Sequence, residues 1–287
     1  MNIKNTNPPT LSLESLKSTN IFELYTKATY GDNLLESFIR CSSDGIIEDV
    51  NQGNTNDCYF LSGLLSLCST PQGQEMVKNA IQWSEDGSYV NVYFAGLGKY
   101  IKVTMDEIKD AIKNDKHSSG DVDVLIMELA MENIIGEKDF DNGGFAREFW
   151  RYFIEDADTS FAKAYGFDDI GQLIGGLFHW SSGAVDLKDS AVEKFLYKLW
   201  KADYDGKGYA ATFSFLTTGD TTWSWTDVYG ETHTVSMDLN ALTFAITEIT
   251  SNTVTFANPW DSENLTYTVT WEEFVNMSIS QFSMVTY

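Results

Sequence analysis

The sequence predicts a protein of the α+β class, with a mainly helical first part and a mainly β last part. Up to about residue 203, apolar residues recur at the spacing of amphipathic helices, and acidic residues open several of these segments. Beyond that point, runs rich in Thr, Val and Phe are separated by short turns, which is typical of strands. With 287 residues, 43% of them apolar and 14% aromatic, the chain can fill a large core.

The N-terminal elements follow from local patterns. The first ten residues are expected to form a loose polar tail, followed by short mixed segments. A turn-rich loop at 51–58 leads into the apolar run YFLSGLLSLC, which predicts a buried helix that Pro71 ends. A second helix is then expected at 74–83, strands at 88–96 and 99–105, and helices from Asp106 and Asp121 and at 145–155, 168–178 and 188–201.

The C-terminal elements are mostly strands. They are expected in the runs YAATFSFL, HTVSMDL, LTFAITEI, NTVTFANPW and LTYTVTW. A short helix, WEEFVNM, and a closing strand, ISQFSMVTY, complete the chain. No internal repeat or low-complexity linker divides it.

The charge of the chain restricts its partners. Acidic side chains outnumber basic ones by 42 to 19, so the formal net charge is −23 at pH 7. A surface of that charge repels phosphate backbones and anionic lipid headgroups. We therefore expect neither nucleic acid nor a membrane as a partner, whereas cationic partners and cations such as Ca²⁺ suit the charge.

Targeting signals and disulfides are not expected. The start, MNIKNTNPPT, has neither the basic nor the apolar region of a secretory signal, and no run approaches the roughly 20 apolar residues that span a bilayer. The three cysteines, Cys41, Cys58 and Cys68, are too few for a disulfide framework. Together these features predict a reduced, cytoplasmic protein.

Cys58 differs from the other two cysteines in its position. Asn56 or Asp57 is expected to cap the helix, which places Cys58 in the first turn, where free backbone N–H groups favour a thiolate. Gln52 lies six residues earlier on the loop, so its amide could fold back over the thiol. Cys68 is expected to be a small core residue, and a buried structural role is the alternative for Cys58.

The chain has three histidines. His117, in the charged loop DKHSSGD, is expected at the solvated surface, and His179, after an apolar run, in or beside the core. His233 opens an expected strand, and Asn258 ends another in FANPW. An asparagine can hold a histidine in one tautomer beside a cysteine nucleophile, and Trp260 could shield that hydrogen bond. Asn before Pro is equally typical of a simple turn.

Three blocks of the sequence carry a resemblance to a known family. IIEDVNQGNTNDCYFLSG resembles the active-site segment of the calpain family of cysteine proteases, approximately D-I-x-Q-G-x-x-G-D-C-W-F-L-A. The matching residues are Gln52, Gly53, Asp57, Cys58, Phe60 and Leu61. ETHTVSM is loosely similar to the family's G-H-A-Y-S-V at His233 and Ser236, and ANPW is similar to N-P-W-G at Asn258, Pro259 and Trp260.

The resemblance covers about residues 46–287. It extends to WEEFVNMSISQF and to the helix VLIMELAMENII with its Gly-Gly turn, at Glu128, Ala130, Gly143 and Gly144. The chain departs from the family at Asn56, Tyr59, Thr232 and Asp261, where the family has Gly, Trp, Gly and Gly. The resemblance implies a two-lobed papain-like fold with a cleft between the lobes. Its parts would be an N-terminal extension packing on the core at 1–45, a helical lobe with the cysteine at 46–205, and an antiparallel β-rich lobe with the histidine and asparagine at 206–287.

The resemblance also implies the chemistry of a cysteine endopeptidase. Cys58 and His233 would form an ion pair, with Asn258 orienting the imidazole, and the reaction would pass through an acyl-enzyme. The side chain of Gln52 and the N–H of Cys58 would hold the oxyanion, with Asp57 and Trp260 in supporting places. His233 and Asn258, 25 residues apart, are expected on neighbouring strands. Peptides or proteins are the implied substrates, and the chemistry needs no cofactor or metal.

The resemblance bears on calcium regulation, and two alternative functions are also compatible with the sequence. Calpain cores close in a calcium-dependent way, so Ca²⁺ is expected as a regulator at most. The segment DYDGKGYAATFS lacks EF-hand ligands, whereas the acidic loops SEDGS and KDFDNGG offer carboxylates. The first alternative is a catalytically inactive calpain-like module that binds peptides or proteins in its cleft. The second is another acyl-transfer enzyme, an amidase or a transglutaminase-like protein, and Asn258 disfavours the latter because such sites usually have Asp there.

Overall fold

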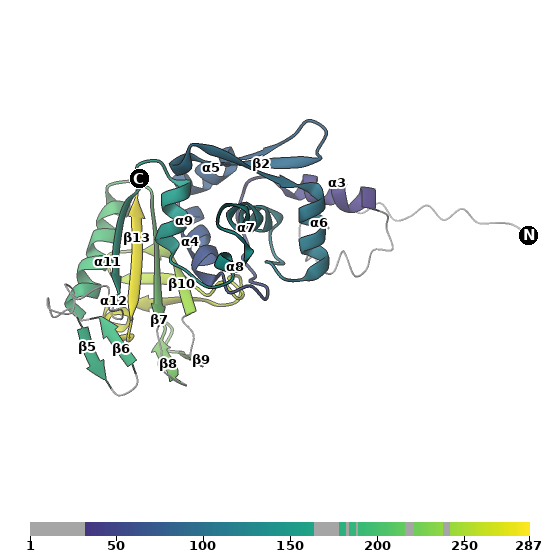
Figure 1. Cartoon of the computed structure of the whole chain (residues 1–287). Helices are drawn as coiled ribbons and strands as arrows, with labels where there is room; N and C mark the ends of the chain where they lie inside the picture. The colour runs from purple at the N-terminus through teal and green to yellow at the C-terminus, as the bar shows by residue number, and fades with distance from the viewer. Residues whose placement is uncertain (1–31, 164–177, 182–183, 188, 216–220, 238–241) are drawn as a thin grey trace, which may run out of the picture.

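The computed structural model describes residues 32–163, 178–181, 184–187, 189–215, 221–237 and 242–287 (Figure 1). Helices dominate the first half and strands the second, which confirms the expected α+β class. The N-terminal tail and all but the last residue of the helix expected at 168–178 fall outside this part. Phe178 begins a strand instead. Within the described chain, no helix combines the length and the apolar character needed to cross a bilayer.

The elements are named here in chain order. The helices are α3 (Asp32–Ser42), α4 (Cys58–Cys68), α5 (Pro71–Ala80), α6 (Met105–Asn114), α7 (Val122–Ile135), α8 (Glu137–Phe140), α9 (Ala146–Phe153), α11 (Asp189–Tyr204) and α12 (Trp271–Asn276), with a 3-10 turn η1 (Ala95–Leu97). The strands are β1 (Ile81–Trp83), β2 (Tyr89–Phe94), β3 (Lys99–Thr104), β4 (Asp158–Lys163), β5 (Phe178–Ser181), β6 (Ala184–Leu187), β7 (Tyr209–Phe215), β8 (Thr221–Thr226), β9 (Thr232–Met237), β10 (Leu242–Ile249), β11 (Thr253–Ala257), β12 (Thr266–Thr270) and β13 (Gln281–Thr286).

All the strand pairs in the described part of the chain are antiparallel. Strands β1, β2 and β3 form a small sheet in the helical part, and β5–β6 and β8–β9 are separate hairpins. The large sheet has the order β12-β11-β10-β7-β13-β4. Strand β4, which the sequence patterns do not predict, comes from the part of the chain expected to be mainly helical and pairs with the last strand, β13. The two parts of the chain are therefore joined through one sheet.

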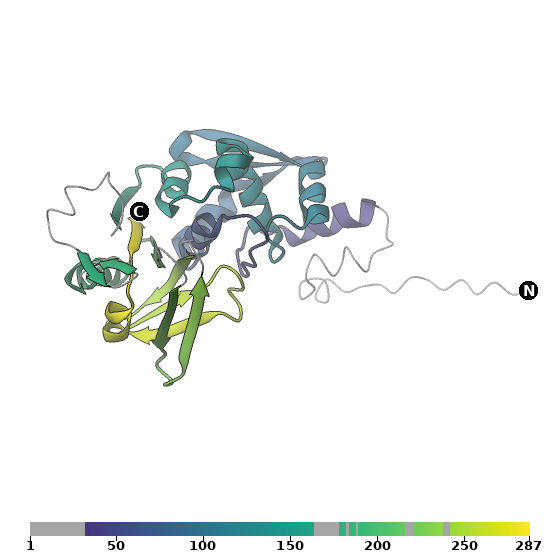
Figure 2. The same ribbon diagram turned by 60° about the horizontal axis from the view of Figure 1, so that its bottom comes forward.

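Helix α4 lies between the helical part and the large sheet (Figures 1 and 2). It is apolar on nearly every side, as a buried helix must be. Two serines bind it to the sheet. The hydroxyl of Ser62 donates to the carbonyl of Thr243 at 2.7 Å, and that of Ser66 donates to the carbonyl of Ile246 at 2.5 Å. Ser66 Oγ also accepts the N–H of Ala211 at 2.7 Å, so it bridges β7 and β10 where their pairing ends.

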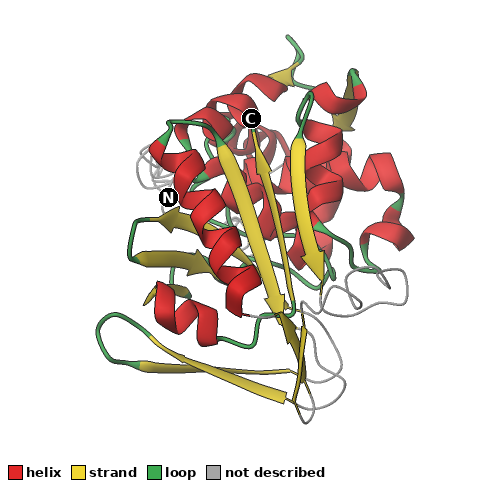
Figure 3. Ribbon diagram, turned by 90° about the vertical axis from the view of Figure 1, so that its left-hand side faces the viewer, coloured by secondary structure: helices red, strands yellow, loops and turns green. Residues whose placement is uncertain are grey.

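The two faces of the large sheet differ, because alternate residues of a strand point to opposite sides. The face toward α4 carries small and polar side chains, among them Thr243 and Ser214. On the other face, Phe213 packs against Phe244 and Phe256 with ring centroids 5.2 and 5.0 Å apart. Helix α11 covers this aromatic face, and Figure 3 shows it in front of the sheet with the N-terminal helices behind.

Two apolar cores result from this layering. The first joins α4 to α9 and the small sheet, and α3 of the expected N-terminal extension packs on it through Ile39. The second joins α11, α12 and the aromatic face of the large sheet, and begins at Val192. Helix α11, which lies before residue 206, therefore shares its core with the strands that follow it.

Pro71 is expected from the sequence to end the helix before it. It lies shortly after the end of α4 and is also the first residue of α5. Thr70 caps α5 by accepting the N–H of Gly73 on its hydroxyl at 3.2 Å, and Pro71 occupies the first helical position, where no N–H is needed. Helix α5 ends at Ala80, and the last residues of the helix expected at 74–83 form β1. The local pattern misses this strand because three residues are too few to show the alternation of a strand.

Replacement of Ser66 by Ala is expected to lower the free energy of unfolding by about 1–3 kcal/mol, because a buried N–H and a buried carbonyl lose their shared partner. Urea denaturation followed by tryptophan fluorescence measures the change. Ser251→Ala, exposed in a turn, is the control and is expected to stay within about 0.5 kcal/mol of wild type. Equal stability of the two variants would contradict the bridging role of Ser66.

Candidate functional site

Cys58 is the first residue of α4, as the sequence predicts. Asp57 stands at the N-cap position, but its side chain makes no capping hydrogen bond. Both the main chain and the hydroxyl of Thr243 hydrogen-bond with the sulfur of Cys58. Thr243 is buried, and its hydroxyl lies 2.9 Å from that of Ser214. The thiol thus has a threonine beside it, which cannot serve as a general base near neutral pH.

The surroundings of Cys58 disfavour a thiolate. Cys58 is partly exposed, but the protein packed around its sulfur removes hydration and raises the pKa of the thiol, and the hydrogen bonds from Thr243 and from the N–H of Tyr59 offset this only in part. The sequence predicts the opposite, since a helix N-terminus favours the thiolate. Burial outweighs the helix terminus because a charged sulfur loses hydration that these hydrogen bonds do not fully replace.

Gln52 turns its amide into its own loop. The Nε2 atom donates to the carbonyl oxygen of Thr55 at 2.7 Å and to Oδ1 of Asp57 at 3.1 Å. Gly53 allows the loop to pack closely, since a Cβ there would lie 2.3 Å from the carbonyl oxygen of His117. Both N–H groups of the Gln52 amide are therefore engaged within the loop, rather than directed at an oxyanion beside the thiol.

Asn258 is buried directly after β11. Its Oδ1 accepts the N–H of Trp260 at 3.0 Å, and its N–H donates to the carbonyl of Leu265 at 2.9 Å. The next residue, Pro259, accepts the N–H of Gln52 on its carbonyl at 2.9 Å. The asparagine loop and the glutamine loop thus lie together, as expected, whereas the indole of Trp260 is 42% exposed and covers no histidine.

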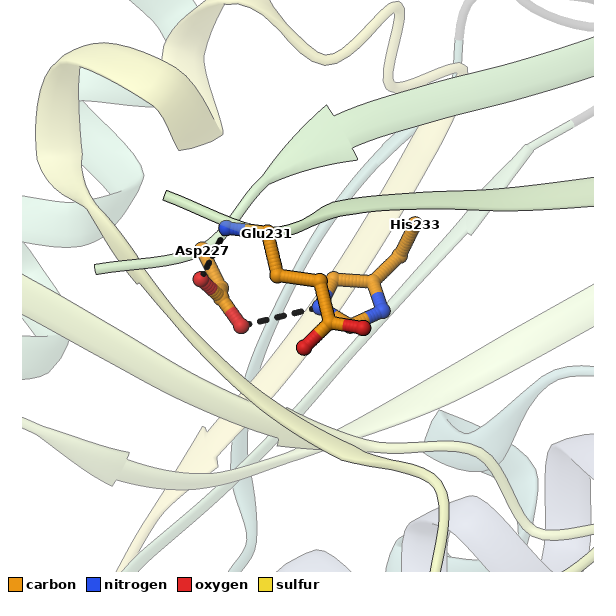
Figure 4. A group of neighbouring side chains, drawn as sticks. All are labelled: Asp227, Glu231 and His233. Atoms are coloured by element: carbon orange, nitrogen blue, oxygen red, sulfur yellow. Dashed lines mark hydrogen bonds and ion pairs between the residues drawn. The ribbon is translucent and has the colours of Figure 1, made fainter. Parts of the chain in front are cut away.

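His233 lies on β9, within the β8–β9 hairpin (Figure 4). Its Nε2 is 2.9 Å from Oδ2 of Asp227, and its ring lies beside those of Trp225 and Tyr267, with centroids 6.1 and 4.6 Å away. Strand β9 and the strand before Asn258 belong to different sheets, so they are not the neighbours that the spacing suggests. Asp227, rather than Asn258, orients the imidazole.

In the described chain, His233 and Cys58 hydrogen-bond with different partners. Thr243 and Phe244 are consecutive in β10, so their side chains point to opposite faces. Trp225, beside His233, packs on the face of Phe244, with 6.1 Å between ring centroids. Cys58 hydrogen-bonds with Thr243 and also packs against the aromatic core that contains Trp225. The structure therefore brings the cysteine, glutamine and asparagine segments together, and it gives the histidine a carboxylate partner on its own hairpin.

The other two histidines do not supply a base in the described chain. His117 is only 7% exposed, and its Nε2 lies 2.6 Å from Oε2 of Glu132 on α7. The prediction of a solvated His117 is wrong, because Gly53 packs on the main chain of this loop and holds it against the protein. His179 lies on β5, and its side chain is outside the described residues.

One group in the described chain has metal-ligand geometry. Asp227, Glu231 and His233 each offer a ligand atom, and these atoms lie within 4.8 Å of one another. Oδ1 of Asp227 accepts the N–H groups of Tyr229 and Glu231, so it also organises the hairpin turn. These hydrogen bonds account for the positions of the side chains without a metal. In the acidic loop SEDGS, Asp86 likewise binds neighbouring serines.

Negative charge gathers near the asparagine loop. Burial raises the pKa of Asp49, and the charges of Glu263 and Asp261 raise it further. Glu263 is exposed, and the exposed ring of Trp260 lies in the same loop. This corner of the molecule therefore offers an aromatic surface next to mutually repelling carboxylates, which favours a cation.

Two residues at the site carry no recognisable signal in the sequence. Thr243 lies in LTFAITEI, where it reads as an ordinary strand residue. Glu128 lies in the segment that resembles a calpain helix, but no neighbouring residue in the sequence indicates that its carboxyl group faces that of Asp57. Both contacts join segments that are far apart in the chain, so only an observed fold or covariation between homologues could reveal them.

The sequence matches no protein-family model and none of the curated proteins with which it was compared. The resemblance to calpains therefore rests on the short motifs around Cys58, His233 and Asn258. What this site can do has to be argued from its own geometry.

The thiolate of Cys58 is expected to appear only at a pH above the usual range of a free thiol, because burial disfavours the charge. Thiolate absorbance followed from acid to alkaline pH measures this titration. The difference between wild type and Cys58→Ser isolates Cys58, since Cys41 and Cys68 are present in both proteins. A thiolate already formed at neutral pH would contradict the prediction.

Proposed function

We propose that this chain is a calpain-like module of papain-like fold that binds a cationic peptide segment and does not cleave it. The observation that carries the proposal is the separation of the two groups: Cys58 bonds with Thr243, while His233 bonds with Asp227. A thiol nucleophile needs a base within about 2.6–3.2 Å or a lowered pKa. Cys58 has a threonine neighbour and a raised pKa.

Three features support the papain-like part of the proposal. A buried helix begins with the cysteine and packs on an antiparallel sheet. The asparagine follows a strand of that sheet, next to the strand that carries Thr243. The glutamine loop and the asparagine loop are hydrogen-bonded to each other. The scaffold resembles that of a cysteine protease in these respects, with a threonine beside the thiol.

The partner is inferred from charge. A chain of net charge −23 attracts cationic molecules over long distances and repels anionic ones. Beside the site, Trp260 exposes an aromatic face, and Asp261 and Glu263 add negative potential. An Arg or Lys side chain can stack on such a ring while carboxylates neutralise its charge. A basic peptide segment meets both conditions.

A cysteine endopeptidase is the second candidate. It is favoured by one observation, the assembly of Gln52, Cys58 and the loop of Asn258 in one place. For this activity, His233 would have to exchange its contact with Asp227 for one with the thiol of Cys58. Calcium is the expected trigger of such a closing motion, so the tests include it.

The non-cleaving module is expected to give no adduct on Cys58 when the full chain is incubated with an E-64-type epoxide, with or without Ca²⁺, because the thiol pKa is raised and His233 is paired with Asp227. Intact-mass analysis measures the adduct, and peptide mapping locates it. Mapping is needed because Cys41 is exposed.

Papain serves as the control for the reagent, and Cys58→Ala as the control for the residue. A single adduct in the wild type that is absent from Cys58→Ala would overturn the proposal in favour of the endopeptidase. If it formed only with Ca²⁺, it would also identify lobe closure as the trigger.

Replacement of Trp260 by Ala is expected to weaken binding of an Arg- and Lys-rich peptide about 10-fold, which corresponds to ~1.4 kcal/mol, because the stacking surface is lost. Fluorescence anisotropy of the labelled peptide measures the dissociation constant. Glu263→Gln is expected to weaken binding mainly at low salt, since the lost attraction is screened at high salt.

Tyr204→Ala removes a ring that is also exposed, but on α11, and is expected to leave the affinity unchanged. An acidic peptide of equal length is expected not to bind. Equal binding of the two peptides, or full affinity in Trp260→Ala, would refute the proposed partner.

A further inference from the structure

Four buried polar atoms without a heavy-atom donor or acceptor of the right kind lie in one region behind Cys58. They are Oε1 of Gln52, Oδ2 of Asp57, Nδ1 of His117 and Oε1 of Glu128. Buried polar atoms are normally paired, and each unpaired one has a cost. Their concentration where the 52–58 loop meets α7 indicates that a proton completes the hydrogen bonding of this region.

Two of these atoms belong to carboxyl groups that face each other. The side chains of Asp57 and Glu128 are in hydrogen-bonding contact, and both are fully buried. Oδ1 of Asp57 accepts from Gln52 at 3.1 Å, and Oε2 of Glu128 accepts the N–H of Ser118 at 2.9 Å. The remaining oxygens, Oδ2 and Oε1, are thus left to meet each other.

A single proton shared by the two carboxyl groups makes their contact favourable. Two ionised carboxylates in a buried site would repel each other and lose their hydration. A proton between them removes one charge and converts the repulsion into a short, charge-assisted hydrogen bond. Glu128 is the better anion, because the Ser118 N–H and the nearby His117 both favour its charge. Asp57 is therefore the acid of the pair.

We propose that Asp57 and Glu128 share one proton at neutral pH, with Asp57 donating through Oδ2 to Oε1 of Glu128, and that this bond fastens the 52–58 loop to α7. The bond explains why Asp57, although at the N-cap, does not cap α4: its two oxygens serve Gln52 and Glu128. The inference is independent of whether the chain binds or cleaves peptides.

The neighbours of the pair set its response to pH. Cys58 and Tyr59 face Asp57 from α4, and His117, hydrogen-bonded with Glu132 of α7, faces Glu128. Burial and then the charge of Glu128 raise the pKa of Asp57 well above its usual range. Between the unfolded and folded pKa values, the folded state binds more protons, so this pair makes stability fall as pH rises through that window.

The test uses infrared spectroscopy of the full chain at about pH 8.5, above the range in which most carboxyls titrate. The buried neighbours Asp121 and Asp123, with pKa values raised by burial to about 7 and about 6, are then mostly ionised. Wild type is expected to keep one C=O band of a protonated carboxyl. Asp57→Asn, whose amide can still donate to Glu128, is expected to lose that band and to remain folded.

Glu128→Gln is expected to lose the same band, since Asp57 then ionises and accepts from the new amide. Asp110→Asn, exposed on α6, is the control and is expected to keep it. The melting temperature of wild type is expected to fall more steeply from neutral to alkaline pH than that of Asp57→Asn. Absence of the band from wild type, its persistence in both variants, or parallel melting curves would overturn the proposal.

Discussion

The arrangement of this protein depends on the packing of α4 against the large sheet. A buried apolar helix can approach a sheet closely only where the facing side chains are small, and here that face carries Thr, Ser and Ala. The hydroxyls of Ser62 and Ser66 bind main-chain groups of β7 and β10 across the interface. These bonds fix the rotation of the helix, and with it the direction in which Cys58 points.

The same packing decides which chemistry the site can support. Because strand residues alternate between the two faces, the helix side of β10 presents Thr243 to the thiol, and the far side presents Phe244 to the aromatic core. The β8–β9 hairpin, with Trp225 and His233, belongs to that aromatic core. A helix that begins with a cysteine and the asparagine loop near it therefore coexist with a thiol that hydrogen-bonds with Thr243.

Acidic side chains have different environments at the surface and in the interior of the protein. At the surface it stays exposed, as around Glu263, and gives the molecule a field that attracts cations. Inside, carboxyls are placed where hydrogen bonds or a proton neutralise them. Asp123 accepts from Ser43 and from the N–H of Gly45, and Asp57 meets Glu128. Several buried carboxyls consequently carry raised pKa values, with burial as the main cause.

The sequence by itself determined the α+β class, most helices and strands, and the place of Cys58 at the start of a helix, because these depend on local periodicity and on capping. It also placed Gln52 on a loop and Asn258 at the end of a strand, and the structure ends β11 one residue before Asn258. Only the tertiary structure decided that β4 joins the large sheet, that His117 is buried, and that Thr243 rather than His233 lies beside the thiol. Each of these depends on contacts between segments far apart in the chain, and a pattern of neighbouring residues carries no information about which face of a sheet a distant hairpin will cover.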